Sequence, residues 1–150
     1  VDRKEAKALI DGYFENYPNV KAYMDQSIQE AREKGYIETI FKRKRYLPDI
    51  NSKNAVVRGY AERNAINAPI QGSAADIIKV AMIRIYQRFQ EEGIRSKMIL
   101  QVHDELNFSV LPEEKEKVQQ IVISEMEAAY KMKAPLRADH GWGHNWLEAH

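Results

Sequence analysis

The sequence predicts an α+β fold, in which an antiparallel β-hairpin packs together with helices. Three observations support this prediction. Apolar residues recur at spacings of three and four over several long stretches, which indicates amphipathic helices. Two β-prone segments, Lys97 to Val102 and Leu106 to Leu111, are separated by only three residues, which indicates a hairpin. Glycine and proline residues fall between the periodic stretches, where they are expected to end one element before the next begins.

The first third of the chain predicts two helices. From Arg3 to Tyr17 the apolar side chains share one face, and Pro18 is expected to end the helix because proline has no amide hydrogen to donate. A second helix follows and is expected to stop at Gly35. Its predicted buried stripe consists of Val20, Tyr23, Met24, Ile28 and Ala31.

The middle of the chain predicts two short strands and two further helices. The strand-like pieces are Tyr36 to Phe41 and Tyr46 to Leu47, on either side of a cationic run. One helix is predicted from about Asn54 to Ala68, limited by Pro69, and another from Ser73 to Glu92, with Gly93 as its stop. Ser73 and Asp76 are predicted to be the N-terminal cap and the first-turn acid of the later helix.

The last third predicts the hairpin, one more helix and a tail. Both flanks of the hairpin are apolar, so we expect it to lie in a core. An amphipathic helix is predicted from Glu113 to Met132, and Leu136 to Asp139 is a candidate for a further strand. Trp142 and Trp146 mark an aromatic tail.

Composition excludes several classes of protein. The chain has 150 residues, 44% hydrophobic and 30% charged, which is too apolar for a disordered tail. No apolar run approaches the roughly 20 residues that span a bilayer, so no membrane partner is expected. The absence of cysteine excludes disulfides, zinc thiolate sites and a cysteine nucleophile, which suits a cytoplasmic location. The missing initiator Met suggests a chain cut from something longer.

The net charge of +1 hides a strong local asymmetry. Between Lys42 and Arg63 there are seven basic residues against two acidic ones. Such a basic block is typical of a surface that binds a polyanion. Charge alone favours the alternative, a solvated loop.

Three ionisable residues, His103, Asp104 and Glu105, occupy the expected tip of the hairpin. Two adjacent carboxylates are hard oxygen ligands of the kind that Mg²⁺ or Mn²⁺ prefers. A divalent ion at this position could stabilise the charges of a phosphoryl transfer. The alternative is structural, because aspartate is also a common turn former.

A second group of polar residues, Arg63, Asn67 and Gln71, recurs every four positions. Arg63 and Asn67 are expected on one helix face, and Gln71 lies just past Pro69, where it could point the same way. Arginine and amide side chains suit the minor groove of DNA, whose acceptors occur at every base pair. The alternative is a solvated polar face.

Two long motifs carry a specific resemblance. They are Arg63-Asn-Ala-Ile-Asn-Ala-Pro-Ile-Gln-Gly-Ser-Ala-Ala-Asp-Ile-Ile78 and Gln101-Val-His-Asp-Glu-Leu106. Weaker support comes from Tyr13-Phe14 with Tyr17-Pro18, from Gly35 to Thr39 and from Arg45 to Ile50. The closing segment, Asn145 to His150, resembles the family's C-terminus. In this order and spacing, the motifs resemble the C-terminal part of the family A DNA polymerases, of the bacterial DNA polymerase I type.

The resemblance implies a role for each matched position. Residues 1–60 would be the trailing part of the fingers subdomain, and residues 61–150 would be the C-terminal part of a palm subdomain. Asp104 would be a catalytic metal ligand, Glu105 would lie beside the metals, and His103 would lie near the primer terminus. Arg63, Asn67 and Gln71 would contact the primer–template DNA. The family often has glycine where this chain has Lys42, and lysine tolerates a positive φ less well.

The resemblance also implies what this sequence lacks. The family's second catalytic aspartate motif and its nucleotide-binding fingers helix have no match here. A two-metal Mg²⁺ site would therefore be incomplete, and the chain alone is expected to be inactive and to self-associate. The predicted function is that of a piece of a DNA-directed DNA polymerase of replication or repair, with primer–template DNA and deoxynucleoside triphosphates as partners of the parent. The alternatives are a non-catalytic nucleic-acid-binding module on a palm scaffold and, with less support, a Mg²⁺-dependent nuclease.

Overall fold

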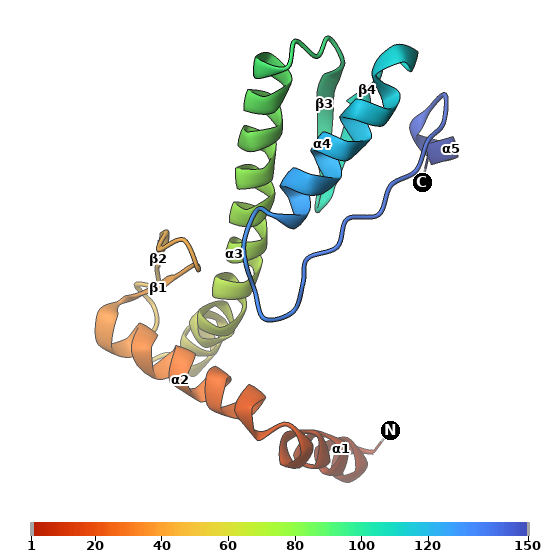
Figure 1. Cartoon of the computed structure of the whole chain (residues 1–150). Helices are drawn as coiled ribbons and strands as arrows, with labels where there is room; N and C mark the ends of the chain where they lie inside the picture. The colour runs from red at the N-terminus through yellow and green to blue at the C-terminus, as the bar shows by residue number, and fades with distance from the viewer. Residues whose placement is uncertain (1, 150) are drawn as a thin grey trace. The chain divides into compact units, whose positions relative to one another are not determined.

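The computed structural model describes residues 2–149, so Val1 and the last residue of the closing segment, His150, lie outside the described residues. The chain forms two compact units, the first ending at Ser73 and the second beginning at Ala74. Figure 1 shows helices and two small antiparallel sheets, which confirms the predicted α+β class. No helix among the described residues is both long enough and apolar enough to cross a membrane.

Two helices open the first unit. Helix α1 (Arg3–Asn16) and helix α2 (Pro18–Lys34) begin and end close to the predicted positions. Pro18 occupies the first turn of α2, where a missing amide hydrogen costs little because that position has no partner inside the helix. Gly35 ends α2 with φ +77°, and its amide donates to the Ala31 carbonyl at 2.8 Å.

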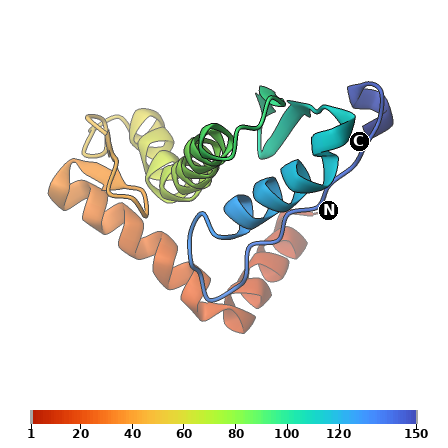
Figure 2. The ribbon, with the colours of Figure 1, turned by 45° about the horizontal axis from the view of Figure 1, so that its top comes forward.

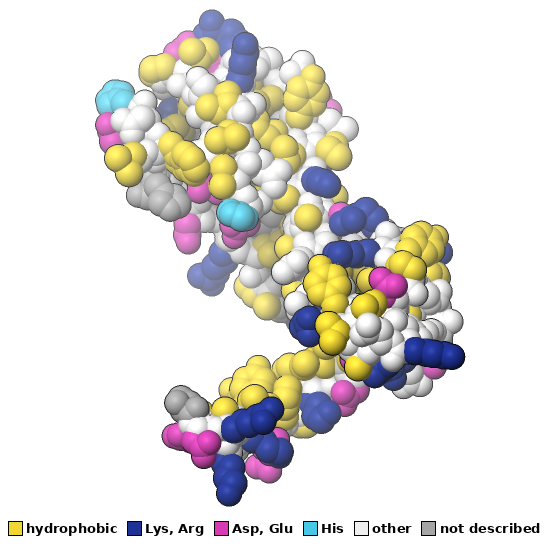
Figure 3. Space-filling view, turned by 180° about the vertical axis from the view of Figure 1, so that it is seen from behind, with side chains coloured by type: hydrophobic (Ala, Val, Ile, Leu, Met, Phe, Trp, Pro, Cys, Tyr) yellow, Lys and Arg dark blue, Asp and Glu magenta, His cyan; other side chains and the backbone are white. Residues whose placement is uncertain are grey.

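The predicted buried stripe of α2 is confirmed only in part, because Ile28 packs against the core while Met24 is no more than half-buried. Among its members only Ala31 is buried, while the side chains of Val20 and Tyr23 are exposed. Helix α1 has no buried residue at all, and Leu9 keeps 66% of its surface exposed. Figure 3 shows hydrophobic side chains gathered along one side of these first two helices. The periodicity correctly predicts the helices, but burial also needs a neighbouring element, and the core meets α2 toward its C-terminal end, at Ile28 and Ala31.

A short hairpin follows, made of β1 (Tyr36–Glu38) and β2 (Lys44–Tyr46). The strands pair antiparallel, with Ile37 opposite Arg45. Lys42 closes the connecting loop with φ +65°, and its amide donates to the Thr39 carbonyl at 2.9 Å. Lysine therefore adopts the left-handed conformation that glycine would adopt with less strain. The exposed cationic run is part of this hairpin rather than a free loop.

The two helices predicted on either side of Pro69 are a single helix, α3 (Ala55–Glu91). Asn54 caps its start, because the side-chain oxygen accepts from the amide of Val56 at 3.0 Å. Pro69 lies inside the helix, although proline cannot donate to the carbonyl four residues earlier. The prediction that Pro69 would end a helix is therefore wrong, and so is the prediction that Ser73 and Asp76 begin another.

The core of the first unit is small. It joins the end of α2, the first hairpin, the following loop and α3, and it includes many alanines. Its buried members are Ala31, Ile37, Leu47, Ile50, Ala61, Ala65 and Ala68. Small side chains on α3 allow the neighbouring elements to approach its backbone closely.

The second unit contains the rest of α3, the hairpin β3 (Lys97–Val102) and β4 (Glu105–Ser109), the short 3₁₀ helix η1 (Pro112–Glu114) and helix α4 (Lys115–Glu127). Gly93 ends α3 with φ +67°, as predicted. Helix α4 ends at Glu127 rather than Met132. The core of the second unit joins α3, α4 and the inner face of the hairpin β3–β4. The largest fully buried side chains of this core are Ile85, Val118 and Ile121.

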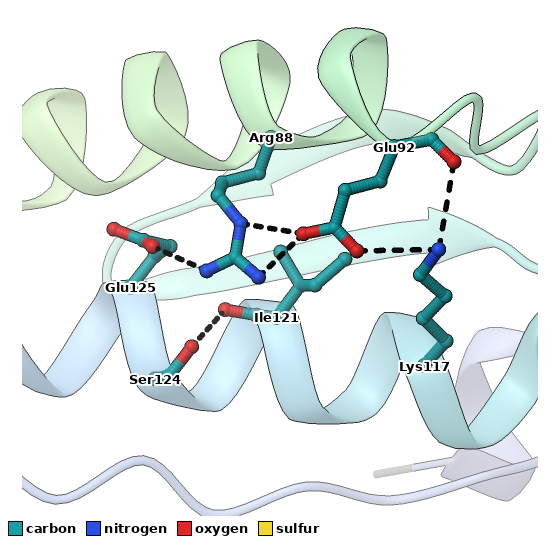
Figure 4. Close-up of polar contacts among 6 residues, drawn as sticks. All are labelled: Arg88, Glu92, Lys117, Ile121, Ser124 and Glu125. Atoms are coloured by element: carbon teal, nitrogen blue, oxygen red, sulfur yellow. Dashed lines mark hydrogen bonds and ion pairs between the residues drawn. The ribbon is translucent and has the colours of Figure 1, made fainter.

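Charged side chains join α3 to α4 at the edge of this core (Figure 4). The Arg88 guanidinium donates to Glu92, just past the end of α3, and to Glu125 of α4, the latter at 3.0 Å. Lys117 of α4 lies 3.2 Å from the Glu92 carboxylate. Hydrogen bonds from Arg88 and Lys117 hold the pKa of Glu92 below its usual value. The side chains of this network are partly exposed to solvent, so we expect its net contribution to stability to be small.

The hairpin is only half buried, which corrects the expectation of a core hairpin. Met98, Leu106, Phe108 and Val110 pack on the core, whereas Ile99 and Leu100 are exposed. A bulge between Met98 and Leu100 interrupts the alternation, so neighbouring apolar residues face different environments. The sheet has two strands within the described residues, and both outer edges lack a partner strand.

The C-terminal segment runs back along α4 (Figure 2). Leu136 to Asp139 forms no strand, which corrects that prediction, because no described strand edge pairs with it. The segment is held by side chains instead. The amide of Ala138 donates to Glu127 at 3.2 Å, and the Trp142 indole donates to Gln119 at 3.2 Å. The short helix α5 (Trp146–Ala149) ends the described chain.

Candidate functional site

The candidate site residues fall into two groups, one in each unit. The first group is the hairpin tip in the second unit. Val102 pairs with Glu105, so the turn has two residues, His103 and Asp104, and Glu105 already belongs to β4. This shortens the predicted three-residue tip by one residue. His103 has φ +53° at the first turn position, where a tight hairpin of this kind requires a positive φ.

The carboxylate residue of the turn, Asp104, is exposed to solvent. Asp104 and His103 are both exposed, while Glu105 is half-buried at the start of β4. The side-chain amide of Gln101, near the end of β3, donates to the His103 carbonyl at 2.9 Å and braces the turn that follows. Asp104 therefore lies on a short turn whose ends are fixed by strand pairing. Such a carboxylate is well placed to bind a cation or another positively charged group.

Glu105 has a partner from the end of the chain. The Trp146 indole nitrogen donates a hydrogen bond to Glu105 Oε1 at 2.7 Å. An indole can only donate, and a carboxylate is its strongest acceptor, so this contact is a charge-assisted hydrogen bond. The C-terminal segment thus reaches one of the two predicted metal-site carboxylates.

The second group lies on α3 in the first unit. Because α3 continues through Pro69, the residues Arg63, Asn67 and Gln71 are at positions i, i+4 and i+8 of one helix. All three are exposed, while Ala61, Ala65 and Ala68 are buried on the other side. The Arg63 guanidinium lies 5.9 Å from the centre of the Tyr60 ring. The continuous helix therefore produces a polar face more regular than a break at Pro69 would give.

Hydrogen bonds and a close approach to Gly72 attach the cationic hairpin to this part of α3. The Ser73 hydroxyl accepts from the Ile40 amide at 2.9 Å and donates to the Pro69 carbonyl. The Arg43 guanidinium donates to the Gly72 carbonyl at 3.3 Å. A Cβ on Gly72 would lie 2.7 Å from Thr39 Cγ2, so only glycine allows this approach without a shift. The hairpin is therefore held beside Gln71.

The basic side chains of this hairpin are open to solvent. Lys42, Arg43, Lys44 and Arg45 are all exposed. Lys44 Nζ lies 4.3 Å from the centre of the Tyr36 ring, and its hydrogen bond to the Tyr36 hydroxyl raises the pKa of Lys44 above its usual value. The lysine keeps its charge at neutral pH. The basic hairpin is thus a local positive surface with the properties expected of a phosphate-binding region.

The fit of a metal ion can be judged from the donors present. Asp104 and Glu105 supply carboxylate oxygens, the ligands that Mg²⁺ prefers. Within residues 2–149, however, no group of three or more His, Cys, Asp or Glu residues has a metal-binding arrangement. The described chain therefore offers part of a ligand set rather than a complete one.

Sequence reasoning missed two groups of residues that shape these sites. One is the set of contacts through Ser73 and Gly72, which the expected helix break at Pro69 concealed. The other is Trp146, which the sequence marked only as aromatic. A weak signal was available for Trp146, because Asn145 followed by Glu148 is a pattern that begins a helix, and a packed tryptophan usually requires an acceptor.

Comparison with known proteins identifies the family. The sequence matches DNA polymerase family A over residues 1–148, and the chain belongs to this family. It is 53% identical over 149 residues to DNA polymerase I of Streptococcus pneumoniae serotype 4 (strain TIGR4), and 53% identical over 148 residues to DNA polymerase I of Caldicellulosiruptor bescii. Each match covers 99% of this chain and 17% of the relative. The chain therefore spans about a sixth of the length of these curated relatives.

A solved structure shows the same fold. The chain superposes with a TM-score of 0.97 and 45% identity on the polymerase domain of Pol1 from M. smegmatis, determined in complex with DNA primer–template and dNTP. The match covers 99% of this chain and 26% of that one. Family membership and fold are thereby confirmed. The assignment of residues 1–60 to fingers and 61–150 to palm, and the roles of individual site residues, stay predictions.

Proposed function

We propose that this chain supplies the template-contacting and metal-binding part of a DNA-directed DNA polymerase. In this proposal Asp104 is a catalytic metal ligand, Glu105 supports the same site, and Arg63, Asn67, Gln71 and His103 contact the primer–template. The observation that carries it is the exposed Asp104 on a two-residue turn, in a chain of family A. The proposed reaction is template-directed nucleotidyl transfer in DNA replication or repair.

The proposed cofactor is Mg²⁺, because the available donors are carboxylates and the family's reaction transfers a phosphoryl group. When bound, the ions would stabilise the charge that develops on the reacting phosphate. The contribution of this chain is to hold the two carboxylates on a paired turn. Since the described residues offer only part of a ligand set, we propose that the chain alone does not catalyse polymerisation.

The polar face of α3 supports a second part of the proposal. Three exposed donors along one helix face could follow the minor groove, where they would test base-pair geometry without reading sequence. The exposed basic hairpin beside Gln71 is proposed to contact phosphates. Primer–template DNA and deoxynucleoside triphosphates are the proposed partners, and a cytoplasmic location remains part of the proposal.

The decisive experiment is Asp104→Asn in a complete polymerase that contains this segment. Primer extension at saturating DNA and Mg²⁺ is expected to fall by more than about a hundredfold, because the substitution removes charge stabilisation in the transition state. Binding of primer–template DNA is expected to stay within a few-fold of the wild type. Near-normal extension would refute the catalytic assignment. DNA binding without extension by the wild type itself would favour a non-catalytic binding module.

The unpaired surfaces of the isolated chain suggest a further consequence. Ile99 and Leu100 on the hairpin and Leu9 and Ile10 on α1 are exposed apolar residues. We propose that the 150-residue chain self-associates at micromolar concentration through such surfaces. Light scattering across a dilution series tests this, and a monomer at all concentrations would contradict it.

A further inference from the structure

Helix α5 and the residues before it are built to hold Trp146 in one place. Asn145 Oδ1 accepts from the Glu148 amide at 3.1 Å, and the Glu148 carboxylate accepts from Asn145 Nδ2 at 2.7 Å. Glu148 also accepts from the His144 amide at 2.9 Å. These reciprocal hydrogen bonds form a capping arrangement around the first residue of α5. That residue is Trp146.

Glycines allow the segment to fold back on itself at this point. A Cβ at Gly143 would lie 2.5 Å from Glu148 Cβ, and a Cβ at Gly141 would collide with the Ala149 carbonyl. Side chains at these two positions are therefore incompatible with the observed turn. The close packing and the capping hydrogen bonds together fix the position from which Trp146 reaches Glu105.

The chain contains a second tryptophan that serves as an internal comparison. Trp142 also donates through its indole nitrogen, but to the neutral Gln119 of α4 at 3.2 Å. Its ring lies 4.6 Å from Lys115 Nζ. Both tryptophans are partly exposed, at 37% for Trp142 and 48% for Trp146. They differ in the partner of the N–H group, since only the Trp146 indole donates to a predicted site carboxylate.

We propose that Trp146 is a positioning residue for the polymerase reaction, acting through its hydrogen bond to Glu105. The inference rests on the proposed function of the hairpin tip. A glutamate side chain has three rotatable bonds, and its ordering costs conformational entropy when it must adopt one arrangement. The fixed N–H of Trp146 supplies that ordering in advance. Glu105 then presents its carboxylate beside Asp104 without reorganisation when the reaction begins.

The test uses a complete family A polymerase that contains this segment. Trp146→Phe removes the N–H donor and keeps an aromatic ring, and Trp142→Phe is the matched control. We expect Trp146→Phe to lower the maximal single-turnover rate by about 10- to 100-fold, as is usual when a partner of a metal-site carboxylate is lost. The Mg²⁺ concentration for half-maximal rate should rise, while DNA affinity stays unchanged. Trp142→Phe should leave all three quantities close to wild type.

A double-mutant cycle shows whether Trp146 acts through Glu105. In a Glu105→Ala polymerase, adding Trp146→Phe should cause no further loss of rate, because the contact no longer exists. A structural role of the ring would instead give additive losses. Additivity, or equal behaviour of Trp146→Phe and Trp142→Phe, would overturn the inference.

A readout without catalysis completes the test. In polymerase labelled with 5-fluorotryptophan, the ¹⁹F resonance that disappears in Trp146→Phe should shift in Glu105→Ala, and the Trp142 resonance should not. A Trp146 resonance that does not shift in Glu105→Ala would overturn the inference. This measurement does not depend on the polymerase activity of either variant. Asp104→Asn separates the two proposals. If it abolishes extension while Trp146→Phe does not slow it, only the positioning role fails, whereas normal extension by Asp104→Asn refutes the proposed function itself.

Discussion

The two β-hairpins of this chain each have a non-glycine residue with a positive φ in the connection, but the connections differ in length and carry opposite charges. Hairpin β1–β2 has Lys42 at φ +65° and an exposed run of cations, and hairpin β3–β4 has His103 at φ +53° beside two carboxylates. Their supports also differ. The first places one strand residue, Ile37, in the core of its unit and is also attached to α3 by polar contacts through Ser73 and Gly72, whereas the second packs several apolar side chains on the core of its unit.

The different supports of the two hairpins suit different functions. A carboxylate that must hold a metal ion within a few tenths of an ångström benefits from a rigid, packed support. Cations that contact phosphates need less precision, because their attraction is long-ranged and weakly directional. The packed hairpin is therefore the better candidate for chemistry, and the polar-anchored one is the better candidate for DNA positioning.

The largest expected effect concerns the apolar support of β3–β4. Phe108 packs on the core, and its ring centre lies 6.0 Å from that of Phe89. Phe108→Ala is expected to lower the free energy of unfolding by about 3 kcal/mol, since it leaves a cavity behind the hairpin. Tyr46→Ala on the first hairpin, where the side chain is 70% exposed, should cost under about 1 kcal/mol. Urea denaturation followed by circular dichroism measures the free energy of unfolding of both variants. Equal losses would show that the two hairpins do not differ in how much their packing stabilises the chain.

A smaller effect is expected at the polar anchor of β1–β2. Ser73→Ala removes the acceptor of the part-buried hydrogen bond that the Ile40 amide donates. The free energy of unfolding should fall by about 1 to 3 kcal/mol. Hydrogen exchange of the Ile40 amide should accelerate, while amides of β3 and β4 remain protected. Unchanged protection of Ile40 would show that the Ser73 hydroxyl does not hold the hairpin.

The charges of the first hairpin make a prediction about DNA. Lys44→Ala combined with Arg45→Ala should weaken duplex DNA binding and reduce the slope of log affinity against log salt concentration by about 2. Lys7→Ala on α1, an exposed lysine paired with Asp11, is the control and should leave the slope unchanged. Fluorescence anisotropy at several salt concentrations measures this. A salt slope unaffected by the double substitution would exclude the basic hairpin from phosphate contact.

The smallest effect concerns the turns themselves. Lys42→Gly should raise the free energy of unfolding by about 0.5 to 1 kcal/mol, because glycine adopts a positive φ with less strain. Loss of the contact between Lys42 and Glu38, at 3.7 Å and largely exposed, should matter little. His103→Gly should relieve its turn in a similar way but should impair primer extension, whereas Lys42→Gly should not. Thermal denaturation and primer extension of both variants would reveal any departure from this split.

The sequence by itself determined the local structure and the family. Helix ends at Gly35 and Gly93, the hairpin around His103 and Asp104, and the two polymerase motifs all follow from local chemistry, because backbone preferences and short-range periodicity are written in neighbouring residues. The regular spacing of Arg63, Asn67 and Gln71 was visible in the same way.

Tertiary structure decided which of these patterns are buried, joined or interrupted. The apolar stripes of α1 and α2 stay largely exposed, and Leu136 to Asp139 is not a strand, because burial and strand pairing require a partner that the sequence pattern does not specify. Helix α3 continues through Pro69, where the hydroxyl of Ser73 donates to the proline carbonyl and also accepts from Ile40, far away in the sequence. The contact between Trp146 and Glu105 joins residues 41 positions apart, and only the fold of the second unit brings their side chains within hydrogen-bonding distance.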